Sequence, residues 1–210
     1  MNAPRLRFAA VLVLLAGMLA WAALAQTSPT KTTALAAPKL GPRVALDTSL
    51  GRIVLELYPE KAPHTVANFL SYVKDGHYNG TIFHRVIADL LIQGGAYTPD
   101  MQLKPERAPI ANEANNGLSN LRGTISAARR ASEKDSAAAQ FFINTVDNRQ
   151  LDYRADTSPA ATGFCVFGRV LEGMDVLDKI RAVPVAEKKP FPADVPVTAV
   201  LIERASVVED

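Results

Sequence analysis

The sequence has little cysteine, tryptophan or histidine: one Cys, one Trp and three His among 210 residues. A single cysteine, Cys165, forms no internal disulfide and excludes a multi-cysteine zinc or iron–sulfur site. Because His64, His77 and His84 are scattered, we expect no metal and no cofactor. An excess of charge of one sign is also missing. Lys and Arg number 23 against 21 Asp and Glu, which gives no electrostatic case for nucleic acid or an anionic membrane as the main partner.

The N-terminal segment has the layout of a secretory signal peptide. Arg5 and Arg7 precede an apolar run over 8–24, and Ala23 and Ala25 stand where a signal peptidase requires small residues. We therefore predict cleavage after Ala25 and export to the periplasm. A retained membrane anchor is the alternative, because the run is only slightly shorter than the roughly 20 apolar residues that span a bilayer.

Cleavage would change what the composition implies. The signal peptide, residues 1–25, holds two basic and no acidic residues, so the mature chain would carry 21 of each sign. Trp21 would leave with it, and the mature chain would contain no tryptophan. Residues 26–42, rich in Thr, Ala, Pro and Lys, are interpreted as a flexible linker. The folded domain is then expected at 43–208, a length that suits one domain.

Short β-rich runs dominate this domain. The first two runs, 44–48 and 52–57, flank the turn residue Gly51 and predict a hairpin. Further strands are predicted at 81–87, 91–95, 123–127, 140–144, 164–170 and 197–207.

Two helices are predicted among these strands. The first begins at Pro63 and ends before Gly76, and the second covers 174–181, each with apolar residues at helical spacing. The strands and helices do not alternate as they do in a parallel sheet. We therefore predict a mainly β fold, a closed eight-stranded antiparallel barrel capped by two α-helices.

One strand run carries an arginine among apolar residues. Strand alternation puts Arg85 on one face with Phe83 and Ile87. His84 and Val86 then point to the opposite face, where we expect His84 to be buried and hydrogen-bonded. A lone arginine is more often a solvated surface residue than a catalyst.

A second run places two aromatic residues side by side. Phe141 and Phe142 must face opposite sides of a strand, so one fills the core while the other lines a surface. The alternative is that both are core residues at a strand end.

Six motifs follow one another along the domain. They are Phe83-His84-Arg85-Val86-Ile87, Ile92-Gln93-Gly94-Gly95, Asn112-Glu113, Arg122-Gly123-Thr124-Ile125-Ser126, Ala139-Gln140-Phe141-Phe142-Ile143-Asn144 and Val166-Phe167-Gly168-Arg169-Val170. With these motifs the chain resembles the cyclophilin-type peptidyl-prolyl cis-trans isomerases over about 44–207, most closely the bacterial exported members. The resemblance implies a barrel with a shallow outer groove for a proline-containing segment, and isomerisation of X–Pro bonds without a cofactor.

The resemblance also implies roles for individual residues. Arg85 corresponds to the catalytic arginine, Gln93 to a glutamine that binds the substrate backbone and helps orient that arginine, and Phe142 to the floor of the proline pocket. The other substrate-binding residues that it implies are Leu90, Leu91, Ala128, Arg129, Gln140, Gln150, Leu151 and Phe164. Arg129 replaces an asparagine that binds substrate through its backbone, a role that a different side chain need not abolish.

The chain departs from the family pattern in the pocket. Leu90 and Leu91 stand where an aromatic residue and methionine are usual, so we expect an apolar pocket of altered contour. Gln150 stands where many eukaryotic members have tryptophan, which removes an N–H donor and a flat contact surface. We therefore predict weak binding of cyclosporin-type inhibitors. The stretch 153–163 is longer than in short family members.

The remaining residues that could carry chemistry are better explained by structural roles. Cys165, in a β-rich run, is interpreted as a small buried hydrophobic residue. Arg129 and Arg130, with the charged residues at 133–135, are interpreted as a solvated charge cluster. No Ser/His/Asp or paired-carboxylate arrangement supports the alternative of a hydrolase.

Two functions are therefore kept. The first is an isomerase that acts on X–Pro bonds in folding or unfolded exported proteins, and the alternative is a proline-peptide-binding chaperone or scaffold with little turnover. We expect a monomer whose partners are proline-containing segments of exported proteins, with no nucleic acid and no stable membrane insertion after cleavage.

Overall fold

The computed structural model describes residues 41–208, so the predicted signal peptide and most of the predicted linker lie outside the described residues. The strands are β1 (Arg43–Thr48), β2 (Gly51–Leu57), β3 (Thr81–Ile87), β4 (Leu91–Gly94), β5 (Thr124–Ala127), β6 (Phe141–Asn144), β7 (Val166–Glu172), β8 (Val185–Lys188), β9 (Phe191–Pro196) and β10 (Leu201–Val208). The helices are α1 (Pro63–Lys74) and α2 (Met174–Arg181), and a short 3-10 helix spans Arg149–Leu151.

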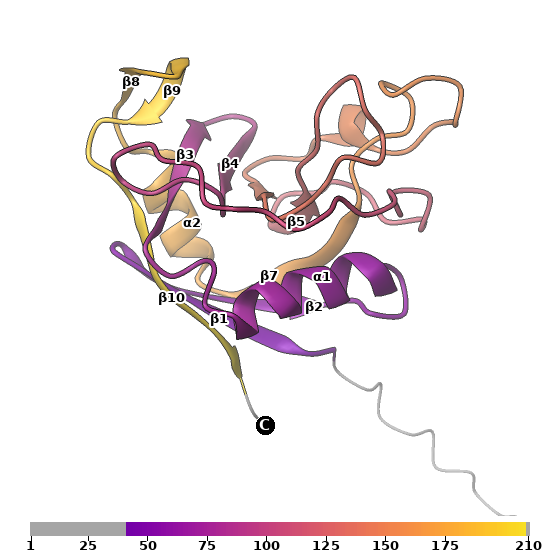
Figure 1. Cartoon of the computed structure of the whole chain (residues 1–210), viewed down its shortest axis with the longest axis horizontal. Coiled ribbons are helices and arrows are strands. Elements are labelled where there is room, and N and C mark those ends of the chain that lie inside the picture. The colour runs from indigo at the N-terminus through magenta and orange to yellow at the C-terminus, as the bar shows by residue number, and fades with distance from the viewer. Residues whose placement is uncertain (1–40, 209–210) are drawn as a thin grey trace, which may run out of the picture. The chain divides into compact units, whose positions relative to one another are not determined.

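Eight of these strands close into an antiparallel barrel in the order β1-β10-β3-β4-β6-β5-β7-β2 (Figure 1). The first hairpin pairs β1 with β2 from Arg43 opposite Glu56 to Thr48 opposite Gly51. Antiparallel pairing of β10 with β1 and with β3 joins the last strand to the first and closes the barrel. The predicted barrel is confirmed, and closure leaves none of these eight strands as a free edge.

Helix α1 begins at Pro63, a first-turn position where the missing N–H of proline costs no hydrogen bond. The preceding Ala62 has no side chain that caps the helix. Glu113, from a loop far along the chain, does this instead. Its carboxylate accepts hydrogen bonds from the backbone N–H groups of His64 at 3.1 Å and Thr65 at 2.8 Å. A long-range contact therefore fixes the start of α1.

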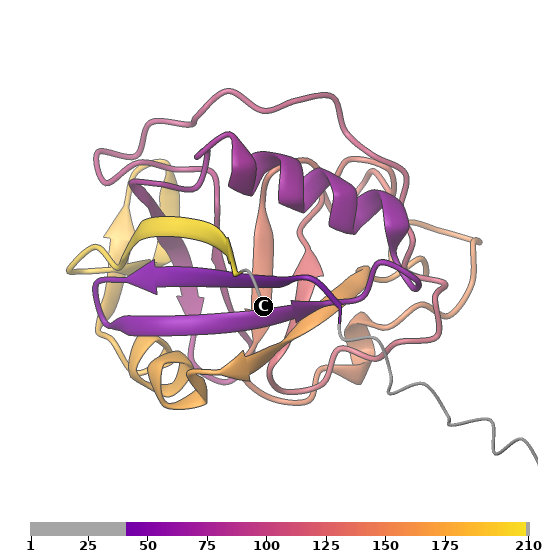
Figure 2. The ribbon, with the colours of Figure 1, turned by 90° about the horizontal axis from the view of Figure 1, so that it is seen from below.

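Both predicted helices are confirmed and bury their apolar faces. Phe69 and Val73 of α1 and Leu177 and Ile180 of α2 belong to the same core cluster as the barrel interior. Figure 2 shows α1 and α2 on opposite sides of the β1–β2 hairpin. Within residues 41–208, no helix is long and apolar enough to cross a membrane.

One small sheet was not predicted. β8 and β9 form a separate antiparallel hairpin that packs against β3 (Figure 1). The last barrel strand begins at Leu201, so the prediction of a strand from 197 was wrong at that end. The segment contains Pro190, Pro192 and Pro196, and proline argues against strands because it cannot donate to a ladder. A two-stranded edge hairpin tolerates this loss.

A β-bulge interrupts β3 beside the candidate site. Phe83 and Arg85 pair with consecutive residues of β4 although His84 lies between them, so β3 carries one extra residue. As a result Phe83 and Val86 both pack in the barrel core. The prediction that these two residues face opposite sides was wrong, because strict alternation assumes a strand without a bulge. The bulge also brings Arg85 into register with Gln93 of β4.

Candidate functional site

Arg85, Gln93 and Phe142 form one row across three neighbouring strands. Arg85 on β3 is opposite Gln93 on β4, and Gln93 is opposite Phe142 on β6. Directly opposed residues on antiparallel strands project from the same face, with strands about 4.8 Å apart. The structure therefore brings together three residues that the sequence carries in three separate motifs.

An apolar cluster on the outside of the barrel adjoins this row. Leu91, Ala128 and Phe142 are buried there, separate from the barrel core. Leu90, Leu151 and Phe164 are partly buried and pack against them. These six residues, here called the outer cluster, were all predicted as site residues, and the structure places them in one patch. The ring centroids of Phe142 and Phe164 lie 5.5 Å apart in an edge-to-face arrangement.

The two predicted glutamines bond to each other. The Nε2 of Gln93 donates to the Oε1 of Gln140 at 3.0 Å, and no hydrogen bond joins Gln93 to Arg85 among residues 41–208. The side chain of Arg85 is 42% exposed, and its Nε lies 3.6 Å from the Oδ2 of Asp194 on β9. Asp194 was not identified from the sequence, because the strand that carries it was not predicted.

The side chain of Arg129 is used for structure. Its Nε donates to the carbonyl of Gly163 at 2.9 Å, and a terminal nitrogen donates to the carbonyl of Pro159 at 2.6 Å. The guanidinium carbon lies 4.6 Å from the centre of the Phe164 ring. Burial lowers the pKa of Arg129. The interpretation of Arg129 as part of a solvated charge cluster was therefore wrong, because this side chain fastens the long 153–163 loop over the outer cluster, whereas Arg130 is exposed and pairs with Glu133.

Gln150 lies apart from the outer cluster. It is exposed on the 3-10 helix, and its Nε2 donates to the Oδ1 of Asn148 at 3.1 Å. Leu151, the next residue, turns back to pack against the cluster. The residue that replaces the usual tryptophan therefore adds no apolar surface to the pocket.

A network of buried amides supports the outer cluster from beneath, and sequence reasoning missed it. The Nδ2 of Asn148 donates to the carbonyl of Leu90 at 2.7 Å and to the Oδ1 of Asn144 at 2.8 Å. The Nδ2 of Asn144 donates to the Oδ1 of Asn120 at 3.3 Å, and the Oδ1 of Asp152 accepts from the Asn120 backbone at 2.7 Å. Because Asn120, Asn144 and Asn148 are fully buried, loss of the hydrogen bonds of their side-chain amides would be costly. Only Asn144, at the end of the apolar run 141–143, carried a signal in the sequence.

The carboxyl of Asp152 ends this network as an acceptor. Burial raises its pKa, but hydrogen bonds from the Asn120 backbone and from the side chains of Ser119 and Asn120 outweigh burial and hold the pKa below its ordinary value. Asp152 therefore stays ionised, and it orders the polypeptide that carries the network.

His84 is buried as predicted, but the prediction of a hydrogen bond was wrong for its Nδ1, which has no partner within 41–208. Its ring lies between those of Tyr97 and Phe191, with centroids 4.7 and 5.2 Å away. Burial, with a smaller contribution from the charge of Arg85, lowers the pKa of His84 to about 4. His84 is therefore neutral at physiological pH and acts as a packing residue.

Cys165 is also buried, as predicted, and burial raises the pKa of its thiol to about 11. A thiol with that pKa is a poor nucleophile.

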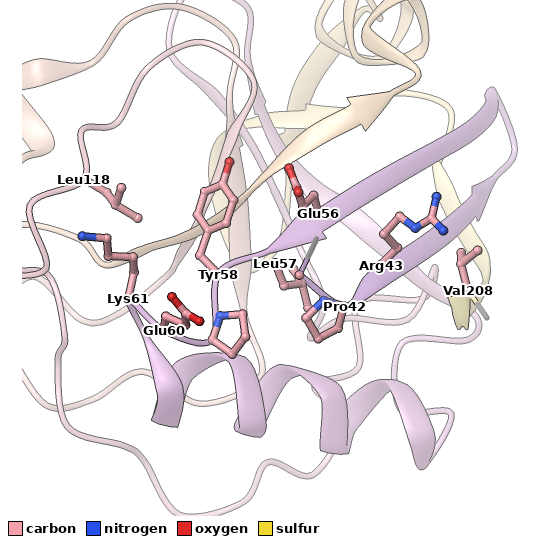
Figure 3. Close-up of a pocket in the computed structure, with 11 residues that line it drawn as sticks. Pro42, Arg43, Glu56, Leu57, Tyr58, Glu60, Lys61, Leu118 and Val208 are labelled. Carbon is pink, nitrogen blue, oxygen red and sulfur yellow. The ribbon is translucent and has the colours of Figure 1, made fainter. Parts of the chain in front are cut away.

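Two hollows in the surface differ in position and character. A hollow of about 290 Å³ adjoins Gln93 and Gln140 and is lined on its other sides by polar groups, among them Arg129 and Glu106. A larger one, of about 670 Å³, is lined by residues such as Pro42, Tyr58 and Leu118 (Figure 3). No predicted site residue lines the larger hollow. Only the smaller one is continuous with the row of Arg85, Gln93 and Phe142.

The geometry of the row suits a reaction that breaks no bond. It offers a permanently charged planar donor, a pair of amides and an apolar cluster beside them. Such a site can hold an apolar ring while it stabilises charge that develops next to that ring.

Comparison with known proteins identifies the family. The family "Cyclophilin type peptidyl-prolyl cis-trans isomerase/CLD" matches residues 43–207. The "Peptidyl-prolyl cis-trans isomerase cyp18" of Streptomyces antibioticus is 54% identical over 165 residues, 79% of this chain and 98% of that protein. The "Peptidyl-prolyl cis-trans isomerase B" of Escherichia coli is 48% identical over 166 residues, 79% of this chain and 99% of that protein.

The fold agrees with this result. A crystal structure of a cyclophilin-type isomerase from Cryptosporidium parvum matches with a TM-score of 0.65 at 23% identity, covering 80% of this chain and 98% of that one. The barrel, its two helices and the family match over 43–207 lead to one conclusion. The chain belongs to the cyclophilin-type peptidyl-prolyl cis-trans isomerases.

Proposed function

We propose that this isomerase is an exported protein that accelerates rotation about X–Pro bonds of folding or unfolded proteins in the periplasm. Arg85, Gln93 and Phe142 are its catalytic residues. The outer cluster, Gln140, the backbone of Arg129 and the exposed Gln150 bind the substrate chain. The protein acts as a monomer.

The reaction requires stabilisation of a twisted amide. The peptide bond before proline has partial double-bond character and a rotation barrier of about 20 kcal/mol, so uncatalysed exchange takes tens of seconds or longer. Twisting the bond localises a lone pair on the prolyl nitrogen. A donor aimed at this nitrogen binds the twisted state more strongly than either planar state, and this difference lowers the barrier.

Arg85 suits the role of this donor. Its guanidinium is charged at every physiological pH and presents its N–H groups in a fixed plane. The side chain is 42% exposed at the edge of the outer cluster, so a bound peptide can reach it. Gln93, next in the row and held by Gln140, is placed to hydrogen-bond the backbone of the substrate.

Phe142 and the rest of the outer cluster suit the role of the proline pocket. Burying the proline ring against Phe142, Leu91 and Leu151 holds one side of the rotating bond still while the other side turns. The cross-strand row of Arg85, Gln93 and Phe142 beside this pocket is the observation that carries the proposed mechanism.

Isomerisation kinetics with a proline-containing peptide test the mechanism. Arg85→Ala is expected to lower kcat/KM by about 100- to 1,000-fold, the usual cost of one transition-state donor. Arg122→Ala is the matched control, since it removes an arginine of similar exposure that pairs with Asp178 at 2.8 Å on α2. Wild-type rates in Arg85→Ala would contradict the assignment.

Export is supported by the sequence of the first 25 residues, with Arg5 and Arg7 before an apolar run that ends in small residues. Cell fractionation with mass spectrometry of the N-terminus tests this part. We expect a soluble periplasmic protein that begins at Gln26. A protein that retains Met1 in the membrane fraction would support the anchor instead.

A chaperone function of the same groove has one observation in its favour. Leu90, Leu91 and Gln150 replace residues that are usual in the family, so the pocket can bind proline segments with a different contour. Suppression of aggregation that survives Arg85→Ala would establish binding that is independent of turnover. If Arg85→Ala abolishes both effects, isomerisation alone accounts for the function.

A further inference from the structure

Within residues 41–208, the side chain of Arg85 has one ion-pair partner. The Oδ2 of Asp194 lies 3.6 Å from the Nε of Arg85, and the two side chains are 36% and 42% exposed. This is the one ion pair of Arg85 in the described part of the chain, and no hydrogen bond to its guanidinium occurs there. Gln93 is committed to Gln140. Asp194 is therefore the one described group that pairs with this long, flexible side chain.

The position of Asp194 is fixed by contacts of the β8–β9 hairpin. Phe191 at the start of β9 packs its ring 5.2 Å from that of His84 and 5.1 Å from that of Tyr97. The Nζ of Lys188 on β8 donates to the carbonyl of Pro99 at 3.0 Å. The hairpin is thus attached to β3, the strand that carries Arg85, and to the loop after β4.

The backbone at Asp194 adopts an unfavourable conformation. Its φ is 66°, in the left-handed region that most side chains avoid and that Asp and Asn tolerate best. The next residue, Val195, is buried and holds the chain there. Residues kept in such conformations by their surroundings concentrate at functional sites. The conformation of Asp194 is therefore of the kind found at functional sites.

We infer that Asp194 is a positioning residue for Arg85. Its carboxylate attracts the Nε edge of the guanidinium and leaves both terminal nitrogens free to face the reacting amide. Orientation of this kind favours the transition state because the donor needs no rearrangement when the amide twists. The inference rests on the proposed catalytic role of Arg85.

Asp194→Asn removes the charge of this side chain and keeps its shape. Asparagine also tolerates a positive φ. We expect kcat/KM to fall about threefold to fivefold, the range that loss of a half-exposed ion pair produces. The loss should lie in kcat, with KM and the free energy of unfolding unchanged. The resonance of the Arg85 Nε–H group should also shift, which reports the loss of the contact, whereas a fall in kcat at constant KM and constant stability is the result that a purely structural role of Asp194 would not cause.

Asp89→Asn is the matched control. Asp89 pairs with Arg181 at 3.5 Å, a separation close to that of Asp194 and Arg85, and its side chain is 91% exposed on the loop between β3 and β4. The control removes the same charge near the same face and should leave kcat/KM unchanged. An equal loss in Asp89→Asn would mean that net charge, and not orientation of Arg85, sets the rate, and it would overturn the inference.

Asp194→Gly separates orientation from stability. Glycine accepts a φ of 66° without strain, so the variant should be at least as stable as the wild type and still lose activity as Asp194→Asn does. Full activity in this variant would refute the inference.

A double-mutant cycle separates this inference from the proposed function. In an Arg85→Ala background, at protein concentrations that make residual catalysis measurable, Asp194→Asn should have no further effect. A further loss of equal size would show that Asp194 acts by another route and would overturn the inference. Full activity of Arg85→Ala would instead refute the catalytic role of Arg85, and the inference with it. Loss in Arg85→Ala with no loss in Asp194→Asn would refute the inference alone.

Discussion

Phe141 and Phe142 are consecutive residues of β6 with the same side chain and nearly the same exposure, 1% and 2%. Phe141 faces the barrel interior, where its ring lies 5.6 Å from that of Phe69 and 5.5 Å from that of Tyr78. Phe142 faces outward into the outer cluster, in register with Gln93. Burial alone therefore does not separate a residue of the fold from a residue of the site. The neighbours on each face do.

The inward member of the pair should matter most for stability. Phe141→Ala leaves a cavity among aromatic rings that cannot collapse, and we expect a loss of about 3–5 kcal/mol in the free energy of unfolding. Chemical denaturation measures this, with Phe141→Leu as the milder variant if the alanine variant does not fold. A loss below about 1 kcal/mol would show that Phe141 does not stabilise the fold as a core residue.

The outward member should matter most for catalysis. Phe142→Ala removes the floor of the proposed proline pocket, so kcat/KM should fall about 10- to 100-fold. The free energy of unfolding should fall by only about 1–2 kcal/mol, since the outer cluster is small and opens to solvent. Peptide isomerisation and denaturation on the same samples give both values. If Phe142→Leu and Phe141→Leu lower kcat/KM equally, the two faces do not differ in function.

His84 and Arg85 are a second pair of adjacent residues, on β3, and the buried member makes stability depend on pH. The pKa of His84 is about 4 when folded, below its ordinary 6.5, because its buried ring disfavours the charge. As pH falls below 6.5 the unfolded chain takes up this proton first. The contribution of neutral His84 to the free energy of unfolding is therefore fully present above about pH 6.5. It is lost progressively as the pH falls to about 4, and the loss is about 2 kcal/mol at pH 5.

His84→Phe should remove this loss. The replacement keeps a ring between Tyr97 and Phe191 and cannot titrate. The difference in unfolding free energy between pH 7.5 and pH 5 should be smaller in the variant by about 2 kcal/mol. His64 and His77 are present in both proteins, so their contributions cancel. Identical pH dependence would mean that His84 is solvated in the native state.

The smallest expected effect concerns Gln150, which is exposed on the 3-10 helix apart from the outer cluster. Gln150→Trp adds an N–H donor and a flat ring without touching the core, so a cyclosporin-type inhibitor should bind about tenfold more tightly. Calorimetric titration of both proteins measures the change. Inhibition of the wild type at nanomolar drug would contradict the prediction that the missing tryptophan weakens binding.

The sequence predicted most of the barrel because its strands follow local rules. Alternating apolar residues and the turn at Gly51 marked the strands, and Pro63 marked the start of α1. The six residues of the outer cluster were identified by resemblance, and the structure brings them into one patch. Local pattern and family motif together therefore located this face of the molecule.

What could not be predicted depends on contacts between distant residues. The bulge at His84 has no local marker, although it sets the register of Arg85. The β8–β9 hairpin is rich in proline and forms where it can pack on β3, so Asp194 was missed with it. The bonds of Arg129 to the 153–163 loop exist only after that loop has folded back.

Titration of isotope-labelled protein with a short proline peptide, followed by backbone amide resonances, tests most directly whether the reaction occurs on the outward face of β3, β4 and β6. We expect the backbone amide resonances of Arg85, Gln93 and Phe142 to change as the peptide is added. Resonances around Tyr58 and Leu118, in the larger hollow of Figure 3, should stay unchanged. Changes confined to the larger hollow, with Arg85 and Phe142 unaffected at saturating peptide, would show that the outward face of β3, β4 and β6 is not the site of the reaction.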